Sequence, residues 1–126
     1  MPRPMLRLYA LRGAISVPSN DAETILACTQ ELMEQLVERN GLEPDDVVSA
    51  IFTCTDDLDA EFPAVAARQM GWDRVPLLCT RELAVPGALP RIIRVLVHYY
   101  AEEGHIARHV YIGEARKLRK DLSAAQ

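Results

Sequence analysis

The sequence is short of several residue types, and each shortage excludes a class of protein. Lysine occurs only twice against twelve arginines, and eighteen acidic residues leave a formal net charge of −4. This acidic balance argues against a nucleic-acid partner, because nucleic-acid binding usually needs a basic face. No apolar run approaches the length of a membrane span, and the N-terminal residues lack the apolar core of a secretion signal.

Cysteine and histidine are also scarce, with three residues of each. Cys28, Cys54 and Cys79 are too scattered for a zinc site and odd in number for a disulfide framework. The histidines show no pairing with cysteine or acidic residues at ligand spacing. We therefore expect a protein of the reducing cytoplasm that uses no metal.

The length and composition fit one folded domain. A chain of 126 residues, nearly half of them apolar, can bury a modest core. No internal repeat or low-complexity tract divides it. We predict a single domain over residues 1–126, in which a charged, mobile C-terminal tail begins at about residue 115.

Hydrophobic periodicity predicts strands that alternate with helices. Asn20 suits the N-cap of the clearest helix, with Glu23 at capping-box spacing, and Asn40-Gly41 supplies a left-handed stop. The predicted strands cover residues 6–12, 47–55, 75–79 and 106–112, and the predicted helices cover residues 20–39, 62–70 and 89–100.

This order of elements indicates an α+β fold. Strands that are separated by helices need crossover connections, so we expect a mixed, partly parallel sheet with helices on one side. Because the helices leave one face of the sheet without cover in a single chain, a symmetric oligomer is expected to bury it.

Four arginines lie beside apolar residues in this acidic chain: Arg12, Arg68, Arg94 and Arg119. A guanidinium grips a carboxylate with two parallel hydrogen bonds, which fixes orientation as well as charge. Together with Cys79, Glu82 and Tyr111, the arginines indicate a pocket for a small metabolite that carries several carboxylates.

Apart from Arg12, each of these residues also has an ordinary structural explanation. On the predicted helix 89–100, Arg94 lies outside the apolar stripe and could simply be solvated. Arg68 suits the C-terminal end of a helix for electrostatic reasons, and Glu82 could pair with Arg81. The remaining three have equally plain roles, as a small core residue, a packing residue and part of a solvated basic tail: Cys79, Tyr111 and Arg119.

Six segments, in order and at near-family spacing, give the chain a specific resemblance to a known family. They are Leu11-Arg12-Gly13-Ala14, Asp57-Leu58-Asp59-Ala60-Glu61-Phe62-Pro63-Ala64, Gly71-Trp72, Val75-Pro76-Leu77-Leu78-Cys79-Thr80-Arg81-Glu82, Ile93-Arg94-Val95 and Arg108-His109-Val110-Tyr111. Over nearly its whole length the chain resembles the small, cofactor-free chorismate mutases of the trimeric α/β-barrel type, found in bacilli and other bacteria.

The resemblance implies an enzyme that converts chorismate to prephenate, the committed step toward phenylalanine and tyrosine. It also implies a homotrimer that forms a pseudo-α/β-barrel, with active sites at the subunit interfaces. The partners are then chorismate, prephenate and two further copies of the chain. Two alternative functions remain. One is deamination of 2-iminoacids, as in another trimeric family that resembles this fold, and the other is non-catalytic sensing of aromatic metabolites.

Residue roles are implied where this sequence matches the family's motifs. Arg94 would lie by the ether oxygen and a carboxylate of the substrate, as a catalytic residue with Glu82 and Arg12. Arg12 and Tyr111 would hold the pyruvyl side of the substrate, and Cys79 and Glu82 would contact its ring hydroxyl. Phe62 of the neighbouring subunit and Leu118 would line the pocket. Arg68 and Arg119 would complete its positive wall. One departure is Val65, where the family often has a lysine one turn before the position of Arg68.

Overall fold

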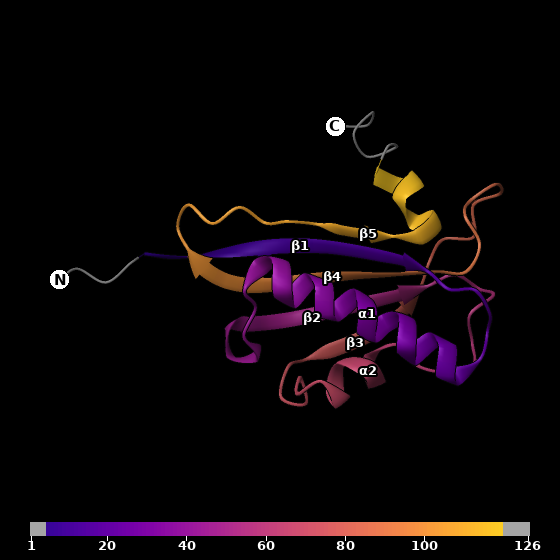
Figure 1. Cartoon of the computed structure of the whole chain (residues 1–126), viewed down its shortest axis with the longest axis horizontal. Coiled ribbons are helices and arrows are strands. Elements are labelled where there is room, and N and C mark those ends of the chain that lie inside the picture. Colours follow the sequence, from indigo (N-terminus) through magenta and orange to yellow (C-terminus); the bar gives the residue numbers. More distant parts are fainter. Residues whose placement is uncertain (1–4, 120–126) are drawn as a thin grey trace.

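The computed structural model describes residues 5–119 and shows one layer of helices on one mixed sheet (Figure 1). None of the helices in residues 5–119 has both the length and the hydropathy that a membrane span requires. The elements in chain order are β1 (Leu6–Ser16), α1 (Ala22–Asn40), the 3-10 helix η1 (Pro44–Asp46), β2 (Val47–Cys54), α2 (Ala64–Gln69), β3 (Leu77–Arg81), β4 (Ile92–Glu102), β5 (Val110–Ile112) and the 3-10 helix η2 (Gly113–Ala115).

The five strands lie in the order β3-β2-β4-β1-β5. The central strand β4 is antiparallel to both of its neighbours, β1 and β2. The two outer strands run parallel to the strands beside them, β5 to β1 and β3 to β2. The predicted α+β fold with a mixed, partly parallel sheet is confirmed.

Helix α1 packs its apolar stripe on the sheet and ends where the sequence predicts. Its buried side chains recur at helical spacing: Ile25, Thr29, Leu32, Met33 and Leu36. Gly41 adopts the left-handed conformation at the C-cap, as expected. The N-cap is Asp21 rather than the predicted Asn20, because the Asp21 carboxylate accepts a hydrogen bond from the Thr24 N–H at 2.8 Å.

Asn20 has a different role, which ties two loops together. Its amide nitrogen donates to the Asp59 carboxylate at 2.8 Å, and its amide oxygen accepts from the N–H groups of Asp59 and Ala60. An asparagine can serve both a donor and an acceptor in this way, whereas an N-cap uses only its oxygen. The side chain therefore fixes the loop that leads toward α2.

Gly13 sets the distance between α1 and β1. A Cβ atom at this position would lie 2.9 Å from Leu36 Cδ1 and 3.1 Å from Leu32 Cδ1. The absence of a side chain lets the helix sit directly on the strand. The groups that approach Gly13 most closely are therefore side chains of α1.

The predicted helix 89–100 is wrong, because this segment forms β4. Every second residue from Ile93 to Tyr99 is buried, which is the period of a strand. Its length matches β1 residue for residue, from Leu6 opposite Glu102 to Ser16 opposite Ile92. The apolar residues on both faces mimic a helical stripe, but the β-branched run of isoleucine and valine favours a strand.

Helices α1 and α2 cover the same face of the sheet (Figure 1). The opposite face, here called the open face, carries every second side chain of β1 and β4, including Leu8, Arg12, Arg94 and Tyr100. Four large apolar side chains on it are 46–66% exposed: Leu6, Leu8, Leu78 and Tyr100. The open face is thus the uncovered surface that the sequence led us to expect.

The C-terminal segment covers one end of the open face. Ala115 is fully buried against Ala14 and Ile92, and Leu118 packs on the same cluster. The segment predicted as a tail therefore begins as packed structure, and residues 120–126 lie outside the described part of the chain. The mobility of that tail stays a prediction.

Candidate active site

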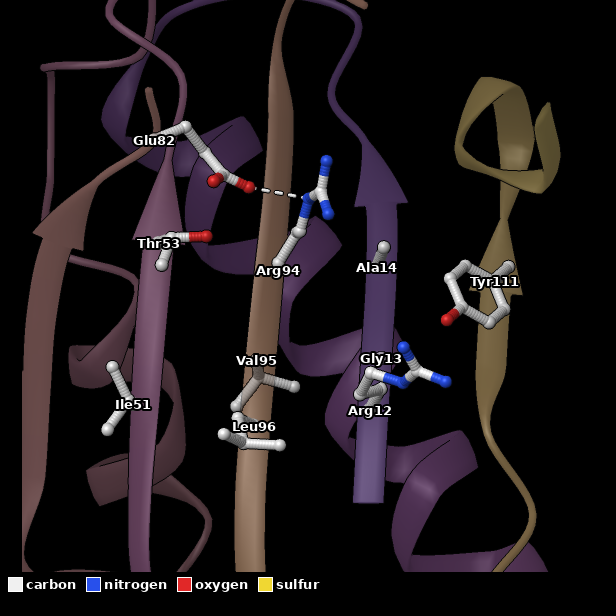
Figure 2. A pocket seen from close by; sticks show the side chains of 10 residues that line it. All are labelled: Arg12, Gly13, Ala14, Ile51, Thr53, Glu82, Arg94, Val95, Leu96 and Tyr111. Carbon is white, nitrogen blue, oxygen red and sulfur yellow. Dashed lines mark ion pairs between the residues drawn. The ribbon is translucent and has the colours of Figure 1, made fainter. Parts of the chain in front are cut away.

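A cavity of about 240 Å³ lies on the open face, where β1, β2, β4 and β5 run side by side (Figure 2). Strand register explains its composition, since Arg94 lies opposite Thr53 of β2 and Ala14 of β1, and Ala14 lies beside Tyr111 of β5. The full lining is Arg12, Gly13, Ala14, Ile51, Thr53, Glu82, Arg94, Val95, Leu96 and Tyr111.

Arg94 and Glu82 form an ion pair at one side of the cavity. Arg94 Nε lies 2.5 Å from Glu82 Oε1, and Figure 2 shows the two terminal nitrogens of the guanidinium turned away from Glu82. The Glu82 side chain is 22% exposed and that of Arg94 is 47% exposed. The carboxylate therefore orients the guanidinium by charge attraction on its Nε side and leaves its outer edge directed elsewhere.

The backbone holds Glu82 in place. Its N–H donates to the carbonyl oxygen of Cys54 at 2.9 Å, directly after the last β2–β3 pair. Arg81, the alternative partner, instead pairs with Asp56 at 3.1 Å on an exposed surface. The structure thus favours the site role of Glu82 over a local pair with its neighbour.

Arg12 and Tyr111 line the other side of the cavity from β1 and β5. Neither sits on the covered face, because each shares the open face with Ala14 through strand alternation and register. The cavity thus combines two arginines and a phenol with apolar walls. Such a surface suits a ligand that has anionic groups and an apolar body.

His109 holds the backbone of Arg12. The Arg12 N–H donates a hydrogen bond to His109 Nδ1 at 2.9 Å, so this nitrogen carries no proton. Partial burial, and after it the charge of Arg12, lower the pKa of His109 from its ordinary value of 6.5. Arg119 lowers it further, which places the charge of Arg119 near the same end of the site.

We expect this histidine to make stability depend on pH. Because its pKa is lower in the folded state, the unfolded chain binds more protons below about pH 6.5 and stability falls as the pH drops. The melting temperature of the natural chain should fall more steeply between about pH 7 and 5.5 than that of His109→Asn, whose amide oxygen accepts but does not titrate. Thermal melts of both proteins measure the difference. Equal slopes would contradict the role of His109.

Leu118 lies in a second cavity, of about 620 Å³, that adjoins the first. Glu82 and Arg94 line both cavities. Leu118 therefore lies near the ion pair, and its contact with a substrate stays a prediction. Arg119 follows it as an exposed residue at the end of the described chain.

Besides Arg119, three predicted site residues line neither of these two cavities of the single chain. Phe62 precedes α2 and is 66% exposed, and Arg68 is exposed in the last turn of α2. Cys79 pairs with Phe52, and its side chain packs against the core on the covered face. The Cys79 thiol therefore packs as a small core residue, and only main-chain atoms of this residue could reach the open face.

Sequence reasoning did not identify Ile51, Thr53 and Leu96 as cavity residues. They line the cavity because β2 and β4 pair at Ile51–Leu96 and Thr53–Arg94. Alternation within residues 47–54 was a usable signal for which side chains share a face. Their proximity to Arg94 follows only once β4 is recognised as a strand.

The chain has close relatives among proteins of one family. Residues 8–122 match the family model described as chorismate mutase type I. The chain belongs to the chorismate mutase type I family. This finding confirms the resemblance predicted from the sequence, and with it the prediction of a chorismate mutase, an isomerase.

Individual relatives agree with the family model. A chorismate mutase AroH from Thermus thermophilus is 48% identical over 118 residues, which is 92% of this chain and 97% of the relative. The chorismate mutase AroH of Bacillus subtilis is 39% identical over 94% of each chain. A solved chorismate mutase structure from Clostridium thermocellum superposes with a TM-score of 0.82 and 48% identity, over 86% of this chain and 98% of that one.

Proposed function

We propose that this chorismate mutase type I chain converts chorismate to prephenate by an intramolecular [3,3] rearrangement, with Arg94 as the main catalytic residue. The observation that carries the proposal is the Arg94–Glu82 pair, which aims a guanidinium at an apolar cavity from a fixed strand position. The reaction needs no nucleophile and no proton transfer, so shape and charge remain as the means of catalysis.

The first contribution is conformational. The substrate must fold into a compact shape in which the two reacting carbons approach each other, and that shape is rarely populated in water. Arg12 and Tyr111 on one side and Arg94 on the other would hold the two carboxylates of the dianion. The apolar floor formed by Ile51 and Leu96 would support the ring.

The second contribution is electrostatic. The C–O bond breaks ahead of formation of the C–C bond, so the ether oxygen gains negative charge in the transition state. A guanidinium beside that oxygen binds the transition state more tightly than the ground state. Glu82 supports this role by holding the Nε side of the Arg94 guanidinium through charge attraction, which directs the outer nitrogens toward the ligand.

We further propose that the active enzyme is a homotrimer with three sites at its interfaces. The exposed apolar residues of the open face provide the surface for association. In such an assembly, Phe62 and Arg68 would be supplied to the cavity by a neighbouring subunit. Leu118 and Arg119 would close the site from the C-terminal segment, and Val65 would weaken the positive rim relative to a lysine. We place this assembly in the cytoplasm.

We expect a nearly flat rate between roughly pH 6 and 9, because no general acid or base takes part in the reaction. Arginine side chains stay charged throughout this range. The profile of kcat, measured from the loss of chorismate absorbance in buffers of constant ionic strength, tests this expectation. A bell-shaped profile within the range would point to proton transfer and contradict the mechanism.

The function itself is tested with purified protein and chorismate. We expect loss of chorismate absorbance, formation of prephenate and a solution mass three times the 14.1 kDa of one chain. Binding of chorismate without turnover would instead indicate a sensor. Release of ammonia from a 2-iminoacid, with chorismate unchanged, would indicate a deaminase.

A further inference from the structure

Two buried side-chain oxygens in the described part of the chain have no hydrogen-bond partner, and both belong to residues that line the same cavity. They are Thr53 Oγ1 and Glu82 Oε1. Glu82 Oε1 has Arg94 Nε as its charge partner, although that contact lacks the geometry of a hydrogen bond. Thr53 Oγ1 has no such compensation.

An unpaired buried hydroxyl needs an explanation, because leaving such a group without a partner destabilises the fold. Thr53 occupies a strand position where valine has nearly the same shape and a favourable preference for strands. The hydroxyl therefore weakens the free protein without a visible structural benefit. Unpaired buried polar groups are expected at functional sites, where they can find a partner in the ligand-bound state.

Thr53 lies directly opposite Arg94 in the antiparallel β2–β4 pair. Side chains at opposed positions on one face have Cβ atoms about 4.5–5.5 Å apart. Figure 2 shows the Thr53 hydroxyl directed toward the strand that carries Arg94, with the Glu82 carboxylate beyond it on the same side of the sheet. The hydroxyl is thus adjacent to the ion pair on which the proposed catalysis depends.

The chemistry of the two unpaired oxygens is complementary. A threonine hydroxyl can donate one hydrogen bond, and an ionised carboxylate can only accept. A hydrogen bond from a hydroxyl to a carboxylate is among the stronger ones in proteins. A small shift of the Glu82 side chain on ligand binding would join the two groups and satisfy both.

We propose that Thr53 is a positioning residue for the Arg94–Glu82 pair. In the ligand-bound enzyme its hydroxyl donates a hydrogen bond to the Glu82 carboxylate and so fixes the group that orients Arg94. The inference rests on the proposed function, because Arg94 must act on the reacting ligand for its orientation to affect the rate. Thr53 itself need not touch the ligand.

Thr53→Val, Thr53→Ser and the natural chain separate the hydroxyl from the methyl group. We expect Thr53→Val to lower kcat about tenfold with little change in KM, because the lost interaction acts in the transition state. Thr53→Ser should stay within about twofold of the natural chain, since it keeps the hydroxyl. Similar losses in both variants would show that packing of the methyl matters, and would overturn the proposal.

The melting temperature gives a readout that does not depend on catalysis. Thr53→Val should melt about 3–5 °C higher than the natural chain, because it removes an unpaired buried hydroxyl at constant shape. Thr80→Val is a matched control, because Thr80 is the exposed β3 partner of Thr53 in the β2–β3 pairing. The control should change neither kcat nor the melting temperature. A lower melting temperature for Thr53→Val would contradict the premise that the hydroxyl is unpaired.

A double-mutant cycle with Glu82→Ala tests whether Thr53 acts through Glu82. If it does, Thr53→Val should lower kcat by less than about twofold once the carboxylate is absent. A full tenfold loss in that background would mean that the hydroxyl meets the ligand directly, which overturns the positioning role. If the natural chain fails to turn over chorismate, the proposed function fails instead, and the melting temperatures still report on the unpaired hydroxyl.

Discussion

Replacement of Arg94 by citrulline is expected to lower kcat by at least about 10²-fold, comparable to the loss of an oxyanion-hole donor. Citrulline keeps the planar shape and length of the side chain but carries no charge. Because the charge of Arg94 is needed mainly when the ether oxygen becomes negative, KM should rise far less than kcat falls. Steady-state kinetics of a semisynthetic enzyme would measure both.

Arg81 provides a matched control for that experiment. It also carries an ion pair, to Asp56, but on an exposed surface outside the cavity that contains Arg94. Arg81→citrulline should leave kcat within about twofold of the natural chain, since exposed pairs contribute little. An unchanged kcat in the Arg94 variant, with melting temperature preserved, would remove the electrostatic role assigned to this residue.

Leu8→Lys is expected to disperse the proposed trimer and to lower kcat/KM by about 10²-fold at micromolar protein, because an unpaired charge in an interface costs several kcal/mol. Leu8 lies opposite Tyr100 on the open face, and both side chains are about half exposed in the single chain. Light scattering should report a particle close to 14.1 kDa in place of the trimer. Activity is lost with it, because Phe62 and Arg68 no longer reach a neighbour's cavity.

Gln30→Lys is the control for this second experiment. It adds the same charge at an exposed position of α1, which covers the opposite side of the sheet. Mass and activity should both stay at their natural values. A trimeric, fully active Leu8→Lys protein would show that the open face around Leu8 is not an interface.

The covered face of this fold was accessible to sequence reasoning. The stripe of α1 and its stop at Asn40-Gly41 depend on residues within a few turns of each other, so local patterns report them well. The N-cap shifted by one residue because two adjacent residues, Asn20 and Asp21, can both cap a helix. Tertiary contacts with the Asp59 loop decided between them.

Local sequence patterns do not predict the structure of the segment that carries Arg94. Residues 92–102 are apolar on both faces, so a helical stripe and a strand alternation fit the same letters. What decides for the strand is pairing with β1 and β2, which lie far away in sequence. The prediction of Arg94 as a site residue depended on the family resemblance, and the register now supplies the physical reason for its place beside Glu82 and Thr53.

The smallest strand limits how long the site stays assembled. β5 has three residues and pairs only with β1 among the described strands, yet it carries Tyr111. Short elements at a sheet edge open most readily and close again many times before the whole domain unfolds. Each such opening removes one wall of the cavity while the Arg94–Glu82 pair stays in place. A ligand that bridges Tyr111 and Arg94 therefore keeps β5 paired with β1, and slower amide exchange along β5 would report its binding.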